Sequence, residues 1–242
     1  MCFLTITYLT GYTQSKKLGL TAQISNSIRD TQVGWFDIDN ESFDNYNVID
    51  KSYAAGLLGS YKIKESNIRL RINHTRINIE EFQNLYQSGT KDYTSVKGQQ
   101  NKLTIAPGLT WLLNKNKLDM YFGFEIPLTF HGKFLMDSET IQTDSITGNV
   151  ISNYYEKAEI PNGYSIGIGG IVGFNYFIHP NFSVGAELSP SLLYARLGGQ
   201  TSRTYRSTNP PPASSGTGKT EDVLEGYTFF EQRFSIGISI WF

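Results

Sequence analysis

The chain has 242 residues, a formal net charge of −1 and a pI near 6.3. It therefore lacks the basic footprint of a nucleic-acid-binding protein, and nucleic acid is not an expected partner. Its mean hydropathy is −0.29, and the absence of any run of 18 apolar residues excludes a transmembrane helix, but not a membrane-spanning sheet whose strands are half polar.

The first thirteen residues resemble the apolar part of a secretory signal peptide. They carry no charged side chain, and Gly11 and Thr13 are small residues of the kind found before a cleavage site. A disordered or strand-forming N-terminus is the alternative. We therefore expect residues 1–13 to be the remnant of a signal peptide and residues 14–242 to form one domain.

From residue 18 onward, apolar residues alternate with small or polar ones. Because successive side chains of a strand point to opposite faces, this period of two predicts strands with one apolar face. We expect eight strands, in chain order at residues 18–25, 53–63, 68–73, 103–111, 118–131, 165–178, 182–194 and 226–242. Proline donates no ladder hydrogen bond, so local irregularity is expected at Pro107, Pro127 and Pro190.

The predicted connections are of two lengths, which alternate strictly along the chain. Short turns are expected at residues 64–67, 114–117 and 179–181. Long polar segments are expected at residues 30–52, 82–100, 136–163 and about 200–225. A closed, antiparallel, up-and-down transmembrane β-barrel of eight strands, with short periplasmic turns and long extracellular loops, predicts this alternation. A soluble β-sandwich or a lipocalin-like barrel has a similar composition but no reason to separate its loops in this way.

The last strand carries the clearest signal. Its apolar residues share one parity and end on an aromatic residue; they are Phe234, Ile236, Ile238, Ile240 and Phe242. With the loop asymmetry, this pattern resembles the small eight-stranded bacterial outer-membrane β-barrels of the OmpA and OmpX type. The resemblance covers roughly residues 17–242. It implies a location in the bacterial outer membrane, contact with outer-membrane lipid, and recognition of these five residues by the barrel-assembly machinery.

Charged side chains gather on the opposite parity, which faces the barrel interior. They are Arg69, Arg71, Glu125, Glu187, Glu231 and Arg233. An eight-stranded barrel has an interior only wide enough for side chains, so these charges must pair. Glu187 and Arg233 lie on neighbouring strands and are expected to pair. We interpret the cluster as a structural plug; a gate or a proton path is the alternative.

No motif in the sequence indicates an enzyme, a cofactor or a metal site. We therefore expect a protein with a filled interior and a structural or surface-interaction role, and with no catalytic, cofactor-binding or metal-binding residues. The alternative is a lipid-modifying or hydrolytic enzyme that uses residues such as His131, Asp137 or Glu139. The long segments, rich in tyrosine, asparagine and serine, suit an unknown extracellular ligand.

Overall fold

The computed structural model describes residues 17–29, 47–50, 52–87, 89–115, 117–208 and 214–242. These residues form strands and no helix, and therefore include no helix that is long and apolar enough to cross a membrane. The predicted signal remnant at residues 1–13 and residues 30–46, which make up most of the predicted long segment 30–52, lie outside the described residues. The strands are β1 (Leu18–Arg29), β2 (Asn47–Asp50), β3 (Tyr53–Ile63), β4 (Ser66–Gln87), β5 (Thr90–Lys115), β6 (Leu118–Glu125), β7 (Leu128–His131), β8 (Phe134–Asp144), β9 (Val150–Ile160), β10 (Gly163–His179), β11 (Phe182–Ser207) and β12 (Ser214–Trp241).

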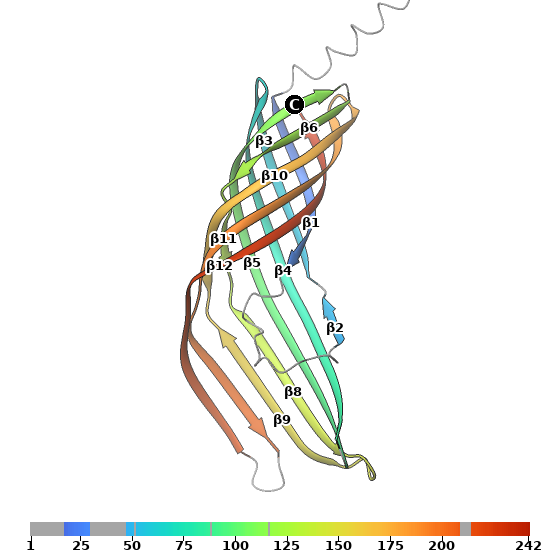
Figure 1. Cartoon of the computed structure of the whole chain (residues 1–242), viewed down its shortest axis with the longest axis vertical. Coiled ribbons are helices and arrows are strands. Elements are labelled where there is room, and N and C mark those ends of the chain that lie inside the picture. Colours follow the sequence, from blue (N-terminus) through green and yellow to red (C-terminus); the bar gives the residue numbers. More distant parts are fainter. Residues whose placement is uncertain (1–16, 30–46, 51, 88, 116, 209–213) are drawn as a thin grey trace, which may run out of the picture.

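The strands close into an antiparallel ring with eight positions, which we call the barrel (Figure 1). Around the ring the order is β1, β3, β4, β5, then β6 with β7 in one position, β10, β11 and β12. The pairing of β12 with β1, from Gly19 opposite Trp241 to Arg29 opposite Glu231, closes the ring. The predicted fold class, an all-β closed antiparallel barrel, is confirmed.

The three short connections that the sequence predicts are together at one end of the barrel. Only two residues separate β3 from β4, β5 from β6, and β10 from β11. Both ends of the described chain are at this end too, where the backbone N–H of Lys17 donates to the carbonyl oxygen of Phe242 at 3.1 Å. The separation of short and long connections is therefore as the sequence predicts.

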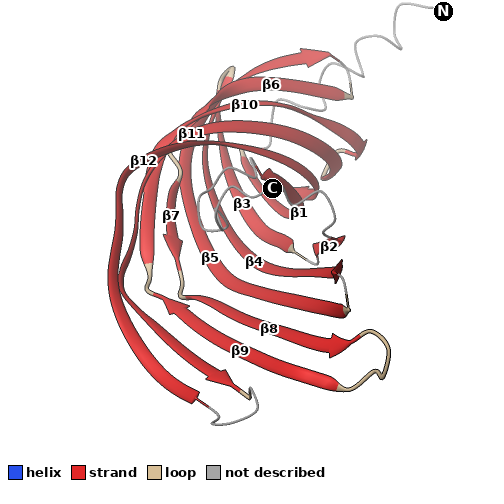
Figure 2. Ribbon diagram, turned by 60° about the horizontal axis from the view of Figure 1, so that its bottom comes forward, coloured by secondary structure: helices blue, strands red, loops and turns tan. Residues whose placement is uncertain are grey.

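Three of the four long segments differ from the expected loops, because they contain mostly strand. The long segments 82–100, 136–163 and 200–225 are largely taken up by β4 and β5, β8 and β9, and β11 and β12. β8 pairs with β5 and β9, and β9 also pairs with β11, so these hairpins join into one curved sheet beyond the barrel (Figure 2). We call this sheet the outer extension. Its tips turn at Gly89 and Gly148, whose φ values of 89° and 72° suit glycine.

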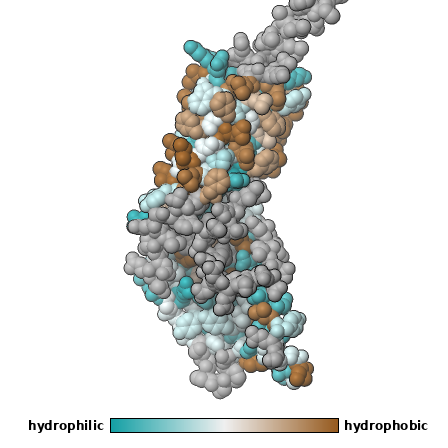
Figure 3. Space-filling model, viewed as in Figure 1, coloured by the Kyte–Doolittle hydropathy of each residue, from teal (hydrophilic) through white to brown (hydrophobic). Residues whose placement is uncertain are grey.

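The outward face of the barrel is apolar over its full circumference. Figure 3 shows one side of this surface, largely in brown and tan, at the end that carries the predicted short turns. Exposed apolar side chains come from every position of the ring and include Leu20, Leu57, Leu70, Leu103, Phe122, Phe124, Ile168, Phe174, Leu188 and Ile238. A continuous apolar surface of this kind is stable against hydrocarbon and not against water. The barrel is therefore a transmembrane one.

In the outer extension the apolar parity is reversed. Along β4, Ile68, Leu70 and Ile72 point outward, whereas Ile77 and Ile79 are buried on the inward parity. Buried apolar residues of the same kind lie on the other strands, and together we call them the apolar layer: Ile77, Ile79, Val96, Phe134 and Ala158. The reversal marks the level at which the outward face leaves lipid for water.

The three prolines coincide with interruptions of strand pairing, as expected. Ile126 and Pro127 separate β6 from β7, yet both strands pair with β5 in the same register. Pro107 lies opposite this gap and accepts a hydrogen bond from the N–H of Ile126 at 2.9 Å. Near Pro190, the pairing of β10 with β11 skips Gly170 and Ile171 and resumes in the same register.

Candidate functional site

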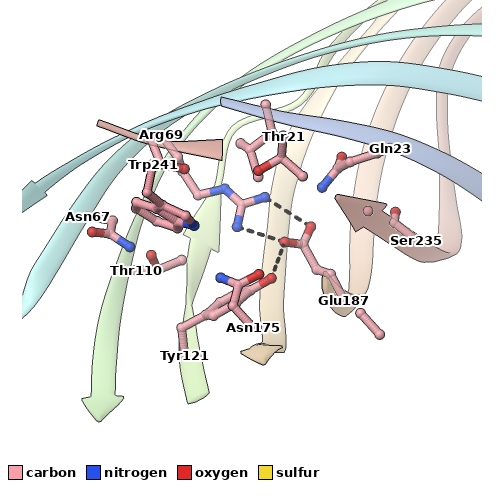
Figure 4. Close-up of a pocket in the computed structure, with 15 residues that line it drawn as sticks. Thr21, Gln23, Asn67, Arg69, Thr110, Tyr121, Asn175, Glu187, Ser235 and Trp241 are labelled. Atoms are coloured by element: carbon pink, nitrogen blue, oxygen red, sulfur yellow. Dashed lines mark hydrogen bonds and ion pairs between the residues drawn. The ribbon is translucent and has the colours of Figure 1, made fainter. Parts of the chain in front are cut away.

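The barrel interior, which we call the lumen, contains two groups of buried charges. The first is the ion pair of Arg69 on β4 with Glu187 on β11, shown in Figure 4. The guanidinium contacts both carboxylate oxygens, at 2.7 Å and 3.0 Å. The hydroxyls of Tyr121 and Ser189 also donate to Glu187, at 3.2 Å and 2.9 Å. The Arg69 guanidinium lies 5.9 Å from the centre of the Tyr121 ring, so the ring face also contacts this cation.

The second group is a carboxylate shared by two arginines. Glu125 on β6 accepts hydrogen bonds at Oε1 from Arg71 on β4 and, at 2.9 Å, from Nη2 of Arg233 on β12. Glu125 and Arg71 have no exposed surface. Two cations on one buried carboxylate compensate part of the cost of removing all three charges from water.

Glycines on the facing strands make room for these side chains. Gly108 and Gly169 are the register partners of Glu125 on β5 and β10. A Cβ on Gly169 would lie 2.5 Å from Ser191 and 3.3 Å from Cγ of Glu125. A Cβ on Gly173 would lie 2.6 Å from the Tyr121 ring. Gly169 and Gly173 of β10 therefore leave the space that the polar side chains of the neighbouring strands occupy.

The structure places five of the six predicted interior residues together, and we call these five the charge layer: Arg69, Arg71, Glu125, Glu187 and Arg233. The expected pairing of Glu187 with Arg233 is wrong, because Glu187 binds Arg69 and Arg233 binds Glu125. Long arginine side chains from β4 and β12 reach across the lumen to carboxylates on more distant strands. Glu231 is half-buried on β12, and its charge acts on Arg71 without a direct ion pair to it.

A small cavity lies in the half of the lumen nearer the short turns. Its volume is about 20 Å³, and Figure 4 shows polar side chains pointing into it from several strands. Trp241 lines it as well, donates from Nε1 to the Ser183 hydroxyl at 3.0 Å, and stacks obliquely on Phe177 at 5.8 Å. Sequence reasoning missed Tyr121 and Trp241, although both have the inward parity.

The residues expected for a loop-borne enzyme do not come together. His131 is buried in the lumen, and its Nε2 lies 2.9 Å from the Ser165 hydroxyl. Asp137 and Glu139 lie on β8 in the outer extension and bind Tyr155 and Asn153 of β9. The distance from His131 to Ser165 fits a nucleophile and its base, but Ser165 has no exposed surface, and Nδ1 of His131 has no protein partner among the described residues.

Asp144 stabilises the tip of the hairpin of β8 and β9 in the outer extension. At the tip between β8 and β9, Asp144 Oδ1 accepts from the N–H groups of Ile146 and Thr147 at 2.9 Å and 2.7 Å and from the Thr147 hydroxyl at 3.0 Å. These donors lower the pKa of the Asp144 carboxyl below its ordinary value. Nowhere in the described part of the chain do three or more His, Cys, Asp or Glu side chains form a group that could hold a metal ion.

The five residues predicted to direct assembly lie along the outward face of β12. Phe234, Ile236, Ile238 and Ile240 are about half exposed, and Phe242 is 64% exposed. They alternate with buried residues that face the lumen, among them Ser235 and Trp241. Their side chains are therefore accessible from the surrounding phase rather than packed inside the barrel.

The chain is similar in structure to several small membrane proteins at low sequence identity. No family model matches the sequence, and no curated protein matches it. Neisserial surface protein A is 12% identical, with 93% of this chain and 97% of that chain covered and a TM-score of 0.34. Ail, the attachment invasion locus protein of Yersinia pestis, is 9% identical over 94% and 99%, with a TM-score of 0.35. Outer membrane protein H (OprH) from P. aeruginosa is 14% identical over 93% and 99%, with a TM-score of 0.33. The fold assignment rests on this chain's own strand pairing and on its apolar outward face.

Proposed function

We infer that this chain is a bacterial outer-membrane β-barrel whose lumen is closed by its own side chains, and that it has a structural or surface-interaction role rather than that of an open pore. The observation that carries the proposal is the charge layer. Its five side chains cross the lumen, are at least nine-tenths buried, and bind one another. Beside them lies a cavity of about 20 Å³, lined by Arg69 and Glu187 among others, which is roughly enough for one water molecule.

The proposal that side chains close the lumen is tested by replacing Arg233 with methionine. This change removes one of the two cations on Glu125 but keeps a long side chain in the lumen. We expect a lower thermal stability and a bilayer conductance that stays near zero. Large, stable channels in Arg233→Met would contradict the structural plug and indicate that the ion pairs act as a gate.

The location is tested by membrane fractionation together with gel migration. We expect the protein in the outer-membrane fraction, with a folded form that migrates differently from the heated form. Recovery as a soluble periplasmic protein without detergent would contradict the proposal. The apolar outward face, from Leu20 on β1 round to Ile238 on β12, supports contact with membrane lipid.

We also propose that the last strand directs assembly through its outward residues. A Phe242→Ser substitution leaves the lumen unchanged, because Phe242 points outward. We expect less folded barrel in cells and unchanged refolding of the purified chain into detergent. Equal losses of folded barrel in cells and in refolding of the purified chain would show a general folding defect instead.

A hydrolytic function is the rival, and the contact between His131 and Ser165 is the observation in its favour. Comparing the acyl pattern of membrane lipid A with and without the protein distinguishes the two. We expect no difference, because the Ser165 hydroxyl is buried. A changed pattern that is lost in Ser165→Ala would overturn the proposed role.

A further inference from the structure

An open groove lies on the outward face of β4 and β5, which run side by side from the barrel into the outer extension (Figure 1). Its volume is about 280 Å³, and we call it the polar groove after the outward side chains that line it: Arg76, Asn78, Glu80, Lys97 and Gln99. Asn78 is the register partner of Gln99, and Glu80 is that of Lys97. Register partners lie directly opposite each other, so the strand pairing itself brings these side chains together.

The polar groove begins just beyond the apolar surface of the barrel. Toward the barrel, the nearest exposed apolar side chains on these two strands are Ile72 and Leu103, four residues from Arg76 and from Gln99 respectively. Four residues correspond to about 10 Å along the barrel axis for a strand tilted by about 40°. The headgroup layer of a bilayer is about 5–8 Å thick on each side, and long cationic side chains reach toward it. The headgroups of lipids around the barrel are therefore within reach of the groove.

The charges of the polar groove favour an anion. Two cations and one carboxylate line it. Arg76 forms no ion pair with another residue that the structure describes, and a guanidinium can donate two parallel hydrogen bonds to one phosphate. Lys97 pairs with Glu80 at 3.1 Å but is 56% exposed, so its ammonium has further donors to offer. The amides of Asn78 and Gln99 add neutral donors between the two cations.

We propose that the polar groove binds the phosphate of a membrane-lipid headgroup. Arg76 is the main ligand of the phosphate, Lys97 is the second cation, and the acyl chains of the same lipid lie against the apolar surface that includes Ile72 and Leu103. The site is on the outside of the barrel. It therefore rests on the membrane location of the barrel and is independent of whether the lumen is closed.

Titration of the refolded full chain with lipid A, in micelles of an uncharged detergent, tests the site. The side-chain amide signals of Asn78 and Gln99 in nuclear magnetic resonance spectra report the binding. We expect saturable shifts of these signals with lipid A and none with lipid A from which the phosphates have been removed. Inorganic phosphate is added in a separate titration. If it binds as tightly as lipid A, the assignment of the site to a lipid is overturned.

Three exposed variants test the role of charge in the polar groove. We expect Arg76→Gln to weaken the binding of lipid A about fivefold, which is the contribution of one cation near a membrane surface. Gln99→Glu, which adds a carboxylate of nearly the same shape, should weaken it as well, with Asn78 as the reporter. Lys91→Gln is the matched control, because Lys91 is the register partner of Tyr86, ten residues beyond Arg76 on β4.

The affinity of Lys91→Gln for lipid A should equal that of the unchanged chain. Heat-modifiable migration on gels checks that each variant is folded. Equal losses of affinity in Arg76→Gln and Lys91→Gln would indicate attraction by overall charge and overturn the site. Equal affinity for lipid A with and without its phosphates would overturn it too.

Discussion

The barrel and the outer extension are built from the same strands, but their apolar faces are opposite. In the barrel, Leu70 of β4 points outward and Arg71 inward. Six residues further along β4, Ile77 points inward, and on the outward face Glu80 forms an ion pair with Lys97 of β5 at 3.1 Å. A strand must match whatever its two faces contact, so a change from lipid to water on one face reverses the pattern without breaking the strand.

The two regions also differ in how they use charge. In the barrel, charges are inside, shared between few partners and fully buried. In the outer extension the cations of the pairs Lys97–Glu80, Lys133–Glu159 and Arg203–Glu156 are exposed, and their glutamates are exposed or half-buried. Buried ion pairs are costly to break because a charge is left without a partner, whereas exposed pairs contribute little. Matched substitutions in the barrel and in the outer extension should therefore have very different effects on the free energy of unfolding.

The largest effect is expected from Glu125→Gln in the charge layer. This change leaves Arg71 and Arg233 buried without a carboxylate, so we expect a loss of about 3–5 kcal/mol in the free energy of unfolding. The matched control is Glu159→Gln, which removes the exposed partner of Lys133 and should cost at most about 1 kcal/mol. Urea unfolding of both variants in lipid vesicles measures the difference, and equal losses would contradict the comparison.

The next effect concerns the outward face. Phe124→Arg places a charge near the middle of the outward apolar residues of β6 and β7, and we expect a loss of about 2–4 kcal/mol. Gln99→Arg places the same charge on the outward face of β5 in the outer extension, where we expect almost no change. The same unfolding measurement applies. A large cost at Gln99 would mean that lipid reaches further along β5 than the parity reversal indicates.

A smaller and local effect is expected from Ile77→Ala in the apolar layer. Truncating a buried isoleucine costs about 2 kcal/mol when the surroundings partly relax. Because Ile77 lies in the outer extension, we expect faster proteolysis of the hairpins while the heat-modifiable barrel remains. Asn78→Ala, on the opposite face of β4, is the control. Loss of the folded barrel in Ile77→Ala would show that the two regions unfold as one unit.

The smallest effect concerns the tip that Asp144 stabilises. The pKa of the Asp144 carboxyl is lower in the folded chain than in the unfolded chain. The stabilisation of the tip by Asp144 is therefore complete above the unfolded-state pKa and is lost as the pH falls through the folded-state pKa. We expect hydrogen-exchange protection of the Ile146 and Thr147 amides at pH about 6 and its loss below about pH 4. In Asp144→Ala the protection should be absent at both values. A pH dependence that persists in this variant would assign it to another group.

Part of the candidate site could be predicted from the sequence alone. The inward parity of Arg69, Arg71, Glu125, Glu187 and Arg233 follows from strand alternation alone, and the need to pair them follows from the narrow lumen. Tyr121 and Trp241 have the same parity, but they carry no formal charge, so the need to pair buried charges did not single them out. The reversal of the apolar parity between Ile72 and Ile77 is also present in the sequence. It marks where the segments predicted to be loops continue as sheet.

The sequence by itself determined the eight barrel segments, the lipid-facing side of each and the antiparallel ring, but not the strands of the outer extension, because side-chain alternation is a local property of an extended chain and the reversed pattern beyond the barrel was taken for loop. Only the tertiary structure decided that Glu187 binds Arg69, that Glu125 is shared by Arg71 and Arg233, and that three hairpins join into one outer sheet. Partners across a lumen depend on strand tilt, on register and on the reach of long side chains, and these are set by the closed ring rather than by any one strand.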